Sequence, residues 1–182
     1  RPLEIDQEVY ASERDTGHRN RAISHLLRNF DVIEGDVEPG LDLYFRQCSI
    51  RVTCRDLGVM AATLACQGRN PLTGERPLDA AVTVQMLSLM GTCGMYDYAG
   101  EWIYNVGIPA KSGVAGGVIA VLPGQVGIGV YSPRLDARGN SVRGIRVCDE
   151  LSRHWDLHMF NSETSGRSTI RRKFTGAEVN SN

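Results

Sequence analysis

A glycine-rich segment from Gly107 to Gly117 holds the residues best suited to chemistry. It reads Gly-Ile-Pro-Ala-Lys-Ser-Gly-Val-Ala-Gly-Gly and directly precedes an apolar run typical of a buried strand. Glycine allows another group to approach the backbone closely, so this segment could offer main-chain N–H groups to a ligand. Lys111 and Ser112 are adjacent, and adjacent side chains of a strand point to opposite faces. We therefore do not expect Lys111 to activate Ser112 as a nucleophile. A plain glycine-rich turn with an exposed lysine would show the same pattern.

Four polar residues elsewhere are candidates for ligand contacts, and three of them also have a plain structural interpretation. Glu13 could be a solvated loop acid, and Asn20 could simply favour the start of a helix. Tyr44 shares a helical face with Leu41, so burial alone would explain it. Tyr96 follows a helix end beside glycine and is less typical of a core residue.

Two histidines, His154 and His158, have the four-residue spacing of a helical metal pair. No His-Glu-x-x-His pattern and no third ligand accompanies them in the sequence. We therefore expect two imidazoles near a helix end and no metal. The sequence also lacks a phosphate loop and a nucleotide fingerprint, and we expect no cofactor.

Several motifs resemble those of known families. Lys111-Ser112-Gly113 resembles the Lys-Thr-Gly element of serine β-lactamases and penicillin-binding proteins, whose partner is a Ser-x-x-Lys nucleophile. A more specific likeness is to the serine-dependent glutaminases, which hydrolyse L-glutamine to L-glutamate and ammonia. This likeness covers residues 10–160 and rests on motifs that occur in the family's order, at 12–20, 43–50, 59–65, 87–97, 109–117 and 139–141.

The resemblance implies a fold and a mechanism. The implied fold class is α+β, of the β-lactamase/transpeptidase type, with an antiparallel sheet flanked by helices and present only as its C-terminal part. The implied mechanism passes through a serine acyl-enzyme. The family's Ser-x-x-Lys lies upstream of the Glu13 motif, where this sequence has no serine before Ser12. No other serine is followed three positions later by lysine, so we expect the nucleophile to lie outside this sequence.

The resemblance assigns three residues to recognition of the substrate. Glu13 would meet the substrate α-ammonium through a charge-assisted hydrogen bond. Asn20 would hold the substrate carboxylate, and a place in the first turn of a helix suits an anion. Tyr44 would line the substrate pocket beside the nucleophile.

The resemblance assigns three further residues to the reacting centre. Tyr96 would take part in proton transfer, and a phenol with a pKa of about 10 needs a nearby positive charge for that role at neutral pH. We expect the lysine of the missing motif to supply that charge. The N–H of Val114 would be one arm of the oxyanion hole, and Ser112 is a secondary candidate for the pocket wall.

Composition limits the classes of function. A length of 182 residues predicts one domain. The 20 basic and 21 acidic side chains nearly balance, which excludes a protein that coats nucleic acid. No run of 18 or more apolar residues occurs, so we expect no membrane span. The cysteines are odd in number and lie in apolar segments, which predicts buried free thiols in a reducing cytoplasm: Cys48, Cys54, Cys66, Cys93 and Cys148.

Apolar spacing predicts helices in the first half of the chain and mainly strands in the second. Helices are expected at 16–30 with Thr16 as N-cap, around 41–48, at 53–66 behind a Thr53 capping box with Gly68 after its end, at 78–93, and from Ser141 to 155. Strands are expected at 102–106, 117–122 and 126–131, the last two joined by a hairpin at 123–125. This order corresponds to half of an α+β sandwich.

These observations lead to one main hypothesis and two alternatives. We expect residues 1–160 to be the C-terminal part of a glutaminase catalytic domain, and 161–182 a polar tail or linker with a basic cluster. The expected partners are L-glutamine, the N-terminal segment of the same enzyme and further copies of the chain. A penicillin-recognising hydrolase is one alternative, although an acyl-peptide offers no free ammonium to Glu13. The other is a non-catalytic fragment with a structural or interaction role.

Overall fold

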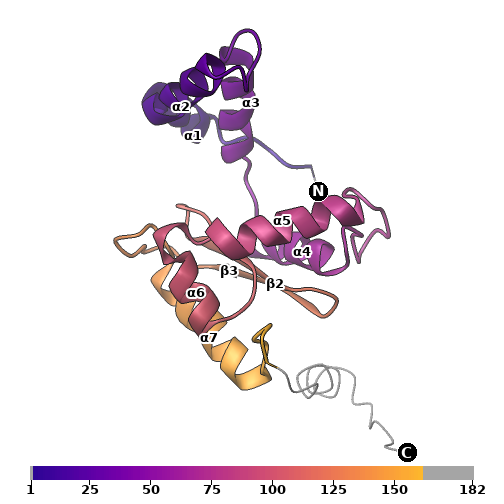
Figure 1. The fold of residues 1–182 in the computed structure, drawn as a ribbon. Coiled ribbons are helices and arrows are strands. Elements are labelled where there is room, and N and C mark those ends of the chain that lie inside the picture. The colour runs from indigo at the N-terminus through magenta and orange to yellow at the C-terminus, as the bar shows by residue number, and fades with distance from the viewer. Residues whose placement is uncertain (1, 162–182) are drawn as a thin grey trace, which may run out of the picture. The chain divides into compact units, whose positions relative to one another are not determined.

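A computed structural model describes residues 2–161, which form two compact units divided between Val52 and Thr53 (Figure 1). The tail expected from residue 161 onward lies outside the described residues, apart from Asn161 itself. The basic cluster at 167–173 also lies outside them.

The first unit consists of three helices, α1 (Gln7–Thr16), α2 (His18–Asn29) and α3 (Glu38–Cys48). Its small core contains Val37, Leu41 and Phe45, with Tyr10 and Ile33 packed against them. The helix expected around 41–48 is confirmed as α3.

The helix expected at 16–30 is wrong at its start. Thr16 is the last residue of α1, and its hydroxyl donates to the Ser12 carbonyl at 2.7 Å instead of capping α2. Gly17 separates the two helices, and a Cβ there would lie 2.4 Å from Cζ of Phe45. The ring of Phe45 thus packs directly on the backbone of the junction, a tertiary contact that helical spacing alone does not reveal.

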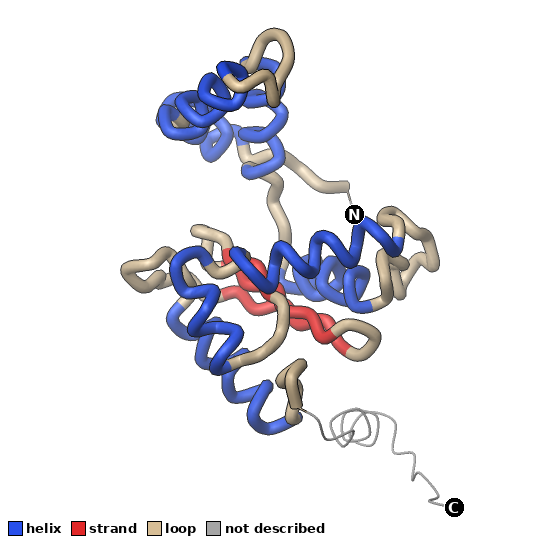
Figure 2. Tube along the Cα trace, in the orientation of Figure 1, coloured by secondary structure: helices blue, strands red, loops and turns tan. Residues whose placement is uncertain are grey.

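The second unit is an antiparallel sheet between two helical layers (Figure 2). Its strands are β1 (Ala110–Ser112), β2 (Gly117–Leu122) and β3 (Val126–Tyr131), in the order β1-β2-β3. Helices α4 (Cys54–Ala65) and α5 (Ala80–Cys93) cover one face, and α6 (Ala99–Asn105) and α7 (Val142–Trp155) cover the other (Figure 1). The expected half of an α+β sandwich is confirmed, including the hairpin between β2 and β3.

Strand β2 is covered on both faces, as its continuous apolar run indicates. Val118 and Ala120 belong to the core beneath α6 and α7, which also contains Trp102 and Cys148. Val121, which points to the opposite face, belongs to a second core with residues of α4 and α5. The middle strand therefore holds the two helical layers together.

The capping box expected at Thr53 is present, and the last helix starts at Ser141 as expected. Thr53 accepts the Asp56 N–H at 3.2 Å while the Asp56 carboxylate accepts the Thr53 N–H at 2.7 Å, which completes the capping box of α4. Ser141 accepts the Gly144 N–H at 3.0 Å and starts α7. Gly68, expected after the end of α4, has φ +83°, which glycine adopts readily.

The strand expected at 102–106 is wrong, because these residues lie in α6 and its C-cap. Ala99, Trp102 and Val106 have helical spacing and are all buried in one core. The Trp102 indole N–H donates to the Ile108 carbonyl at 2.7 Å. Burial of this helical face and the indole hydrogen bond outweigh the strand preference of the aromatic and β-branched residues.

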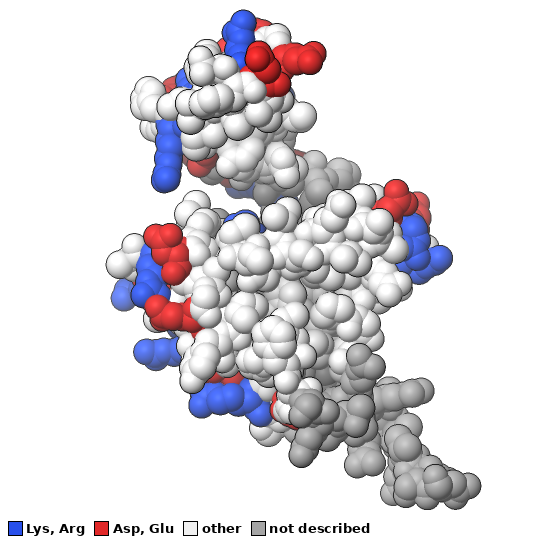
Figure 3. Space-filling model, viewed as in Figure 1, with Lys and Arg blue, Asp and Glu red and all other residues white. Residues whose placement is uncertain are grey.

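The expectation of buried thiols is also largely wrong. Cys148 is buried in the core, whereas the other four cysteines are exposed: Cys48, Cys54, Cys66 and Cys93. Cys93 lies on α5, a helix without a charged residue, so an apolar neighbourhood in the sequence did not imply burial. Figure 3 shows mainly uncharged surface over α5, and Leu89 and Val84 are among its exposed side chains.

Candidate active site

Strand β1 carries the Lys-Ser-Gly element on the edge of the sheet. Ala110 and Ser112 are buried and Lys111 is exposed, so the lysine and the serine point to opposite faces as expected. On the edge of β1 away from β2, the Ser112 N–H donates to the Gly94 carbonyl at 3.0 Å. A Cβ at Gly94 would lie 1.8 Å from the Ala110 carbonyl oxygen, so only glycine allows the end of α5 to lie this close to β1.

Tyr96 begins a short 3-10 helix, η1 (Tyr96–Tyr98), with its backbone in the left-handed region at φ +53°. A residue other than glycine in this region costs free energy, so the surrounding structure must hold it there. One restraint comes from Asn140, whose side-chain amide donates to the carbonyl of Met95 at 3.3 Å. Asn140 is itself fully buried, and its backbone N–H donates to Asp136 Oδ1 at 2.9 Å.

The Tyr96 side chain lies against the Lys-Ser-Gly strand. Its hydroxyl donates to the Ser112 carbonyl at 3.4 Å. The Lys111 ammonium lies 4.8 Å from the centroid of the Tyr96 ring and donates to the same carbonyl oxygen. Partial burial raises the pKa of Tyr96. Although Lys111 is exposed as a whole, partial burial of its ammonium lowers its pKa, while Cys93 raises it.

Val114 lies in the turn between β1 and β2 and is 68% exposed. The turn is closed by hydrogen bonds of Gly113 and Gly116, which leave the peptide of Val114 at its tip. Within residues 2–161 no protein acceptor is bonded to the Val114 N–H, so this donor is available to a ligand. A Cβ at Gly139 would lie 3.7 Å from the Tyr96 ring and 4.0 Å from the Val114 side chain, so Tyr96 and Val114 border the same glycine.

Two buried polar atoms beside this site have no hydrogen-bond partner among the described residues. They are the Ser112 hydroxyl oxygen and Asn140 Oδ1. Ser112 is only 2% exposed, so its hydroxyl is poorly placed to act as a nucleophile on an external substrate. Buried polar groups normally have partners, and such exceptions often occur at functional sites.

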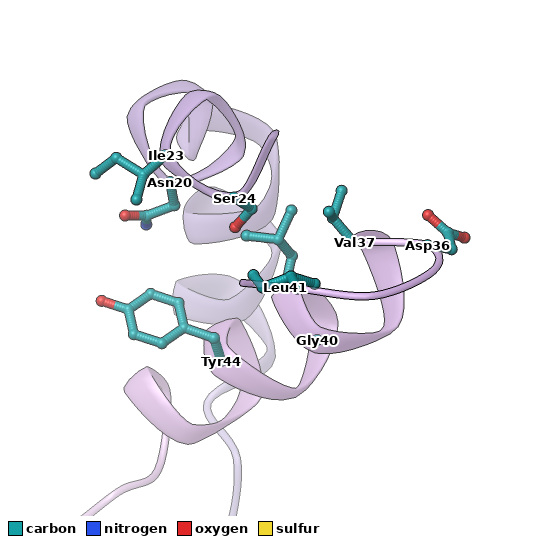
Figure 4. A pocket seen from close by; sticks show the side chains of 9 residues that line it. Asn20, Ile23, Ser24, Asp36, Val37, Gly40, Leu41 and Tyr44 are labelled. Carbon is teal, nitrogen blue, oxygen red and sulfur yellow. The ribbon is translucent and has the colours of Figure 1, made fainter. Parts of the chain in front are cut away.

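In the first unit, Asn20 and Tyr44 line one pocket of about 380 Å³ between α2 and α3 (Figure 4). Both side chains point the same way in this view, and Leu41, which is buried, also lines the pocket. Asn20 lies in the first turn of α2, as expected, and Tyr44 is 46% exposed rather than buried. Glu13 lies on α1, partly buried, and is not among the residues that line this pocket.

The six expected site residues therefore fall into two groups. Glu13, Asn20 and Tyr44 belong to the first unit, and Tyr96, Ser112 and Val114 belong to the second, where contacts connect them. Asn140 and Gly139 complete the second group but received no role from the sequence. Their one sequence signal is the Gly-Asn-Ser motif at 139–141, which does not indicate that Asn140 contacts Met95.

The histidine pair does not form a helical metal site. Helix α7 ends at Trp155, so His154 is helical and His158 is not. The His158 ring lies against Gly107 and 5.8 Å from the ring of Phe160. Over the described part of the chain, no cluster of three or more His, Cys, Asp or Glu side chains could hold a metal ion.

The fold and the Lys-Ser-Gly element indicate the class of this protein. An α+β fold whose edge strand carries Lys-Ser-Gly resembles the serine β-lactamases and penicillin-binding proteins, whose corresponding element is Lys-Thr-Gly. A family model described as Glutaminase matches residues 1–160. The chain belongs to the glutaminase family, which decides between the two hydrolase classes left open by the Lys-Ser-Gly element.

Curated relatives agree with this assignment. A protein named Glutaminase from Trichormus variabilis is 59% identical over 156 residues, which cover 86% of this chain and 47% of that protein. Glutaminase 1 of Bradyrhizobium diazoefficiens is 56% identical over 170 residues, 93% of this chain and 28% of that protein. The chain thus spans half or less of the length of these relatives.

Solved structures match the fold. The crystal structure of Mglu shares 48% identity with a TM-score of 0.84, over 90% of this chain and 41% of that one. The Bacillus subtilis glutaminase YbgJ shares 36% identity with a TM-score of 0.83, over 88% of this chain and 57% of that one. The YbgJ structure is a covalent complex with 5-oxo-L-norleucine, formed by reaction with 6-diazo-5-oxo-L-norleucine. Among the helices of residues 2–161, none has the length and apolar character needed to cross a bilayer.

Proposed function

We propose that the whole protein hydrolyses L-glutamine to L-glutamate and ammonia through a serine acyl-enzyme. This chain would supply part of the substrate pocket and the loop that stabilises the oxyanion. The observation that carries the proposal is the available N–H of Val114, which follows the Lys-Ser-Gly strand and whose side chain borders the same glycine, Gly139, as the Tyr96 ring. Family membership supports glutamine as the substrate.

The residues of the first unit would bind the substrate's amino-acid end. The Glu13 carboxylate would accept hydrogen bonds from the α-ammonium of glutamine, which selects a free amino acid. The Asn20 amide would donate to the α-carboxylate near the N-terminus of α2, where a negative charge is favoured. The Tyr44 hydroxyl, in the same pocket as Asn20, would complete the substrate contacts.

The residues of the second unit would serve the reacting amide. As the serine attacks, negative charge develops on the carbonyl oxygen, and the Val114 N–H would donate to it. Tyr96 would exchange a proton at the reacting centre, held by its contact with the Ser112 carbonyl. Ser112 would form part of the pocket wall rather than act as the nucleophile, which its burial supports.

The serine nucleophile would come from a part of the enzyme that these 182 residues do not include. The sequence contains no Ser-x-x-Lys motif, and the curated relatives are about two to four times longer than the matched region. Residues 1–160 would then be the C-terminal part of the catalytic domain. The 182-residue chain alone should show no turnover, because hydrogen-bond donors without a nucleophile cannot form the acyl intermediate.

The function is tested by glutamate production from L-glutamine in the full-length enzyme. We expect turnover together with a covalent adduct of 6-diazo-5-oxo-L-norleucine detected by intact mass. Glu13→Gln should raise KM about 10-fold or more, because a charge-assisted hydrogen bond is lost, whereas Asp15→Asn on the exposed face of the same helix should not. A full-length enzyme that forms no glutamate would contradict the proposal.

Two further properties are part of the proposal. We propose a homo-oligomer in which a second copy covers the uncharged face of α5, where Val84 and Leu89 are exposed. Leu89→Glu should then lower the mass measured by light scattering. We also propose a cytoplasmic location, because exposed unpaired thiols such as those of Cys66 and Cys93 persist best in a reducing compartment.

A further inference from the structure

Lys111 lies over the Tyr96 ring and shares a hydrogen-bond acceptor with the Tyr96 hydroxyl. Its ammonium lies over the Tyr96 ring, 4.8 Å from the centroid. The same ammonium donates to the Ser112 carbonyl oxygen, which also accepts the Tyr96 hydroxyl. The ammonium and the phenol hydroxyl therefore share one acceptor, the carbonyl oxygen of Ser112. Ser112 lies two residues before Val114 in the sequence.

This arrangement supplies a charge that proton transfer by a phenol needs. Burial raises the pKa of Tyr96, which makes its phenolate less accessible at neutral pH. A positive charge near the ring and the oxygen has the opposite effect, because it stabilises the phenolate relative to the phenol. The sequence led us to expect this charge from a lysine outside the chain, whereas Lys111 already provides one.

We propose that Lys111 is a positioning residue for the glutaminase reaction, whose ammonium holds the Tyr96 ring through its face and stabilises negative charge on the phenol oxygen. This inference rests on the proposed function, in which Tyr96 exchanges a proton. It assigns the lysine of the Lys-Ser-Gly strand to Tyr96 rather than to Ser112, whose side chain points to the other face of β1.

Two titratable groups, Cys93 and Tyr96, lie near the Lys111 ammonium and affect the pH at which it loses its proton. Burial lowers the pKa of Lys111, and Cys93, at the end of α5, raises it. Tyr96 is the other titratable group in contact with the ammonium. Loss of the Lys111 proton at alkaline pH would remove the charge from Tyr96, so activity should fall along that limb of the pH profile.

The first test compares Lys111→Met and Lys111→Arg in the full-length enzyme. Met fills similar space and packs well on an aromatic ring, so a purely structural role would survive that change. We expect Lys111→Met to lower kcat about 10-fold to 100-fold, within the usual contribution of acid–base catalysis, with little change in KM. Lys111→Arg should restore most of kcat and move the alkaline limb to higher pH, because arginine stays protonated.

A matched control comes from the next tyrosine of the same 3-10 helix. Arg138 lies 5.3 Å from the centroid of the Tyr98 ring and pairs with Glu101 at 2.8 Å. Arg138→Met removes a cation from a tyrosine ring in the same way, and it should leave kcat and the alkaline limb unchanged. Equal losses in Lys111→Met and Arg138→Met would overturn the specific role of Lys111.

A second test does not depend on turnover. The ionisation of tyrosines is followed by the ultraviolet absorbance of the phenolate. The contribution of Tyr96 is obtained by subtracting the titration curve of the Tyr96→Phe enzyme from that of the enzyme that retains Tyr96. In the Lys111→Arg background, where the cation stays charged throughout the titration, this step should lie at lower pH than in the Lys111→Met background. A Tyr96 step at the same pH in both variants would overturn the inference, whereas absent glutamine turnover with steps at different pH would overturn only the proposed function.

Discussion

The side-chain amide of Asn140 donates to the carbonyl of Met95 at 3.3 Å and so ties the loop before α7 to the residue that precedes Tyr96. Tyr96 has φ +53°, an unfavourable value for a residue with a side chain. The buried side chain of Asn140, far from Tyr96 in sequence, therefore helps to hold Tyr96 in its strained backbone conformation.

Replacement of Asn140 should lower kcat, because its side chain restrains the backbone that precedes Tyr96. Asn140→Ala removes one of two donors to the Met95 carbonyl, which still accepts the Tyr98 N–H at 3.1 Å. The loss of this single hydrogen bond should cost about 0.5–1.5 kcal/mol of unfolding free energy. Because Tyr96 loses a restraint, kcat should fall by more than KM rises. Steady-state kinetics and chemical denaturation of the full-length enzyme check both effects.

Ser141 provides the matched control for that prediction. Ser141→Ala removes the cap of α7 from the same loop and should cost about 0.5–2 kcal/mol, a similar loss of stability. It should leave kcat nearly unchanged, since Ser141 bonds Ser132 and Gly144 rather than Met95. Parallel losses of kcat in both variants would show that Asn140 acts only through stability.

Gly94 should tolerate no side chain. A Cβ there would lie 1.8 Å from the Ala110 carbonyl oxygen and 2.6 Å from that of Met90, both backbone atoms. Gly94→Ala should therefore separate α5 from β1 and destabilise the protein by several kcal/mol, about 3 or more. Gly91→Ala, three residues earlier and with no atom within 4 Å of its added Cβ, should instead stabilise α5 by about 0.5–1 kcal/mol. Thermal midpoints measure both, and similar midpoints would contradict the close approach.

Val114 separates the role of the backbone from that of the side chain. Val114→Ala keeps the N–H and should change kcat little, because the side chain is 68% exposed. Val114→Pro removes the donor and should lower kcat about 10²–10³-fold. Circular dichroism must show that the proline variant is folded, since proline also restricts φ. A folded Val114→Pro enzyme with normal kcat would remove Val114 from the oxyanion hole.

The Cys148 thiol should resist alkylation in the native protein. Burial raises its pKa from 9.0 to about 12, so almost no thiolate forms at pH 8. Iodoacetamide labelling followed by peptide mass spectrometry should modify the exposed Cys66 before unfolding and Cys148 only after it. The raised pKa also means that folding free energy from this site declines as pH rises from about 9 towards 12, because the unfolded chain loses its thiol proton first. Rapid native labelling of Cys148 would contradict its burial.

The sequence alone determined the features that depend on neighbouring residues. The capping box of Thr53 and Asp56 needs only short-range hydrogen bonds and occurs as expected. The last helix also starts at Ser141, as its apolar spacing predicted. The apolar run at 117–122 predicted a strand covered on both faces, because no polar alternation marks a solvent face. The motifs around Tyr96 and Lys111 also identified the glutaminase family without any coordinates.

The tertiary structure decided the features that depend on contacts between distant segments. Trp102 lies in a helix because its ring is buried and its indole bonds the Ile108 carbonyl, against its local strand preference. The break at Gly17 exists because Phe45, far along the chain, packs on that backbone. Lys111 lies over the Tyr96 ring because the 3-10 helix of Tyr96 packs on strand β1 at the Ser112 carbonyl. The spacing of these residues along the sequence does not reveal this contact.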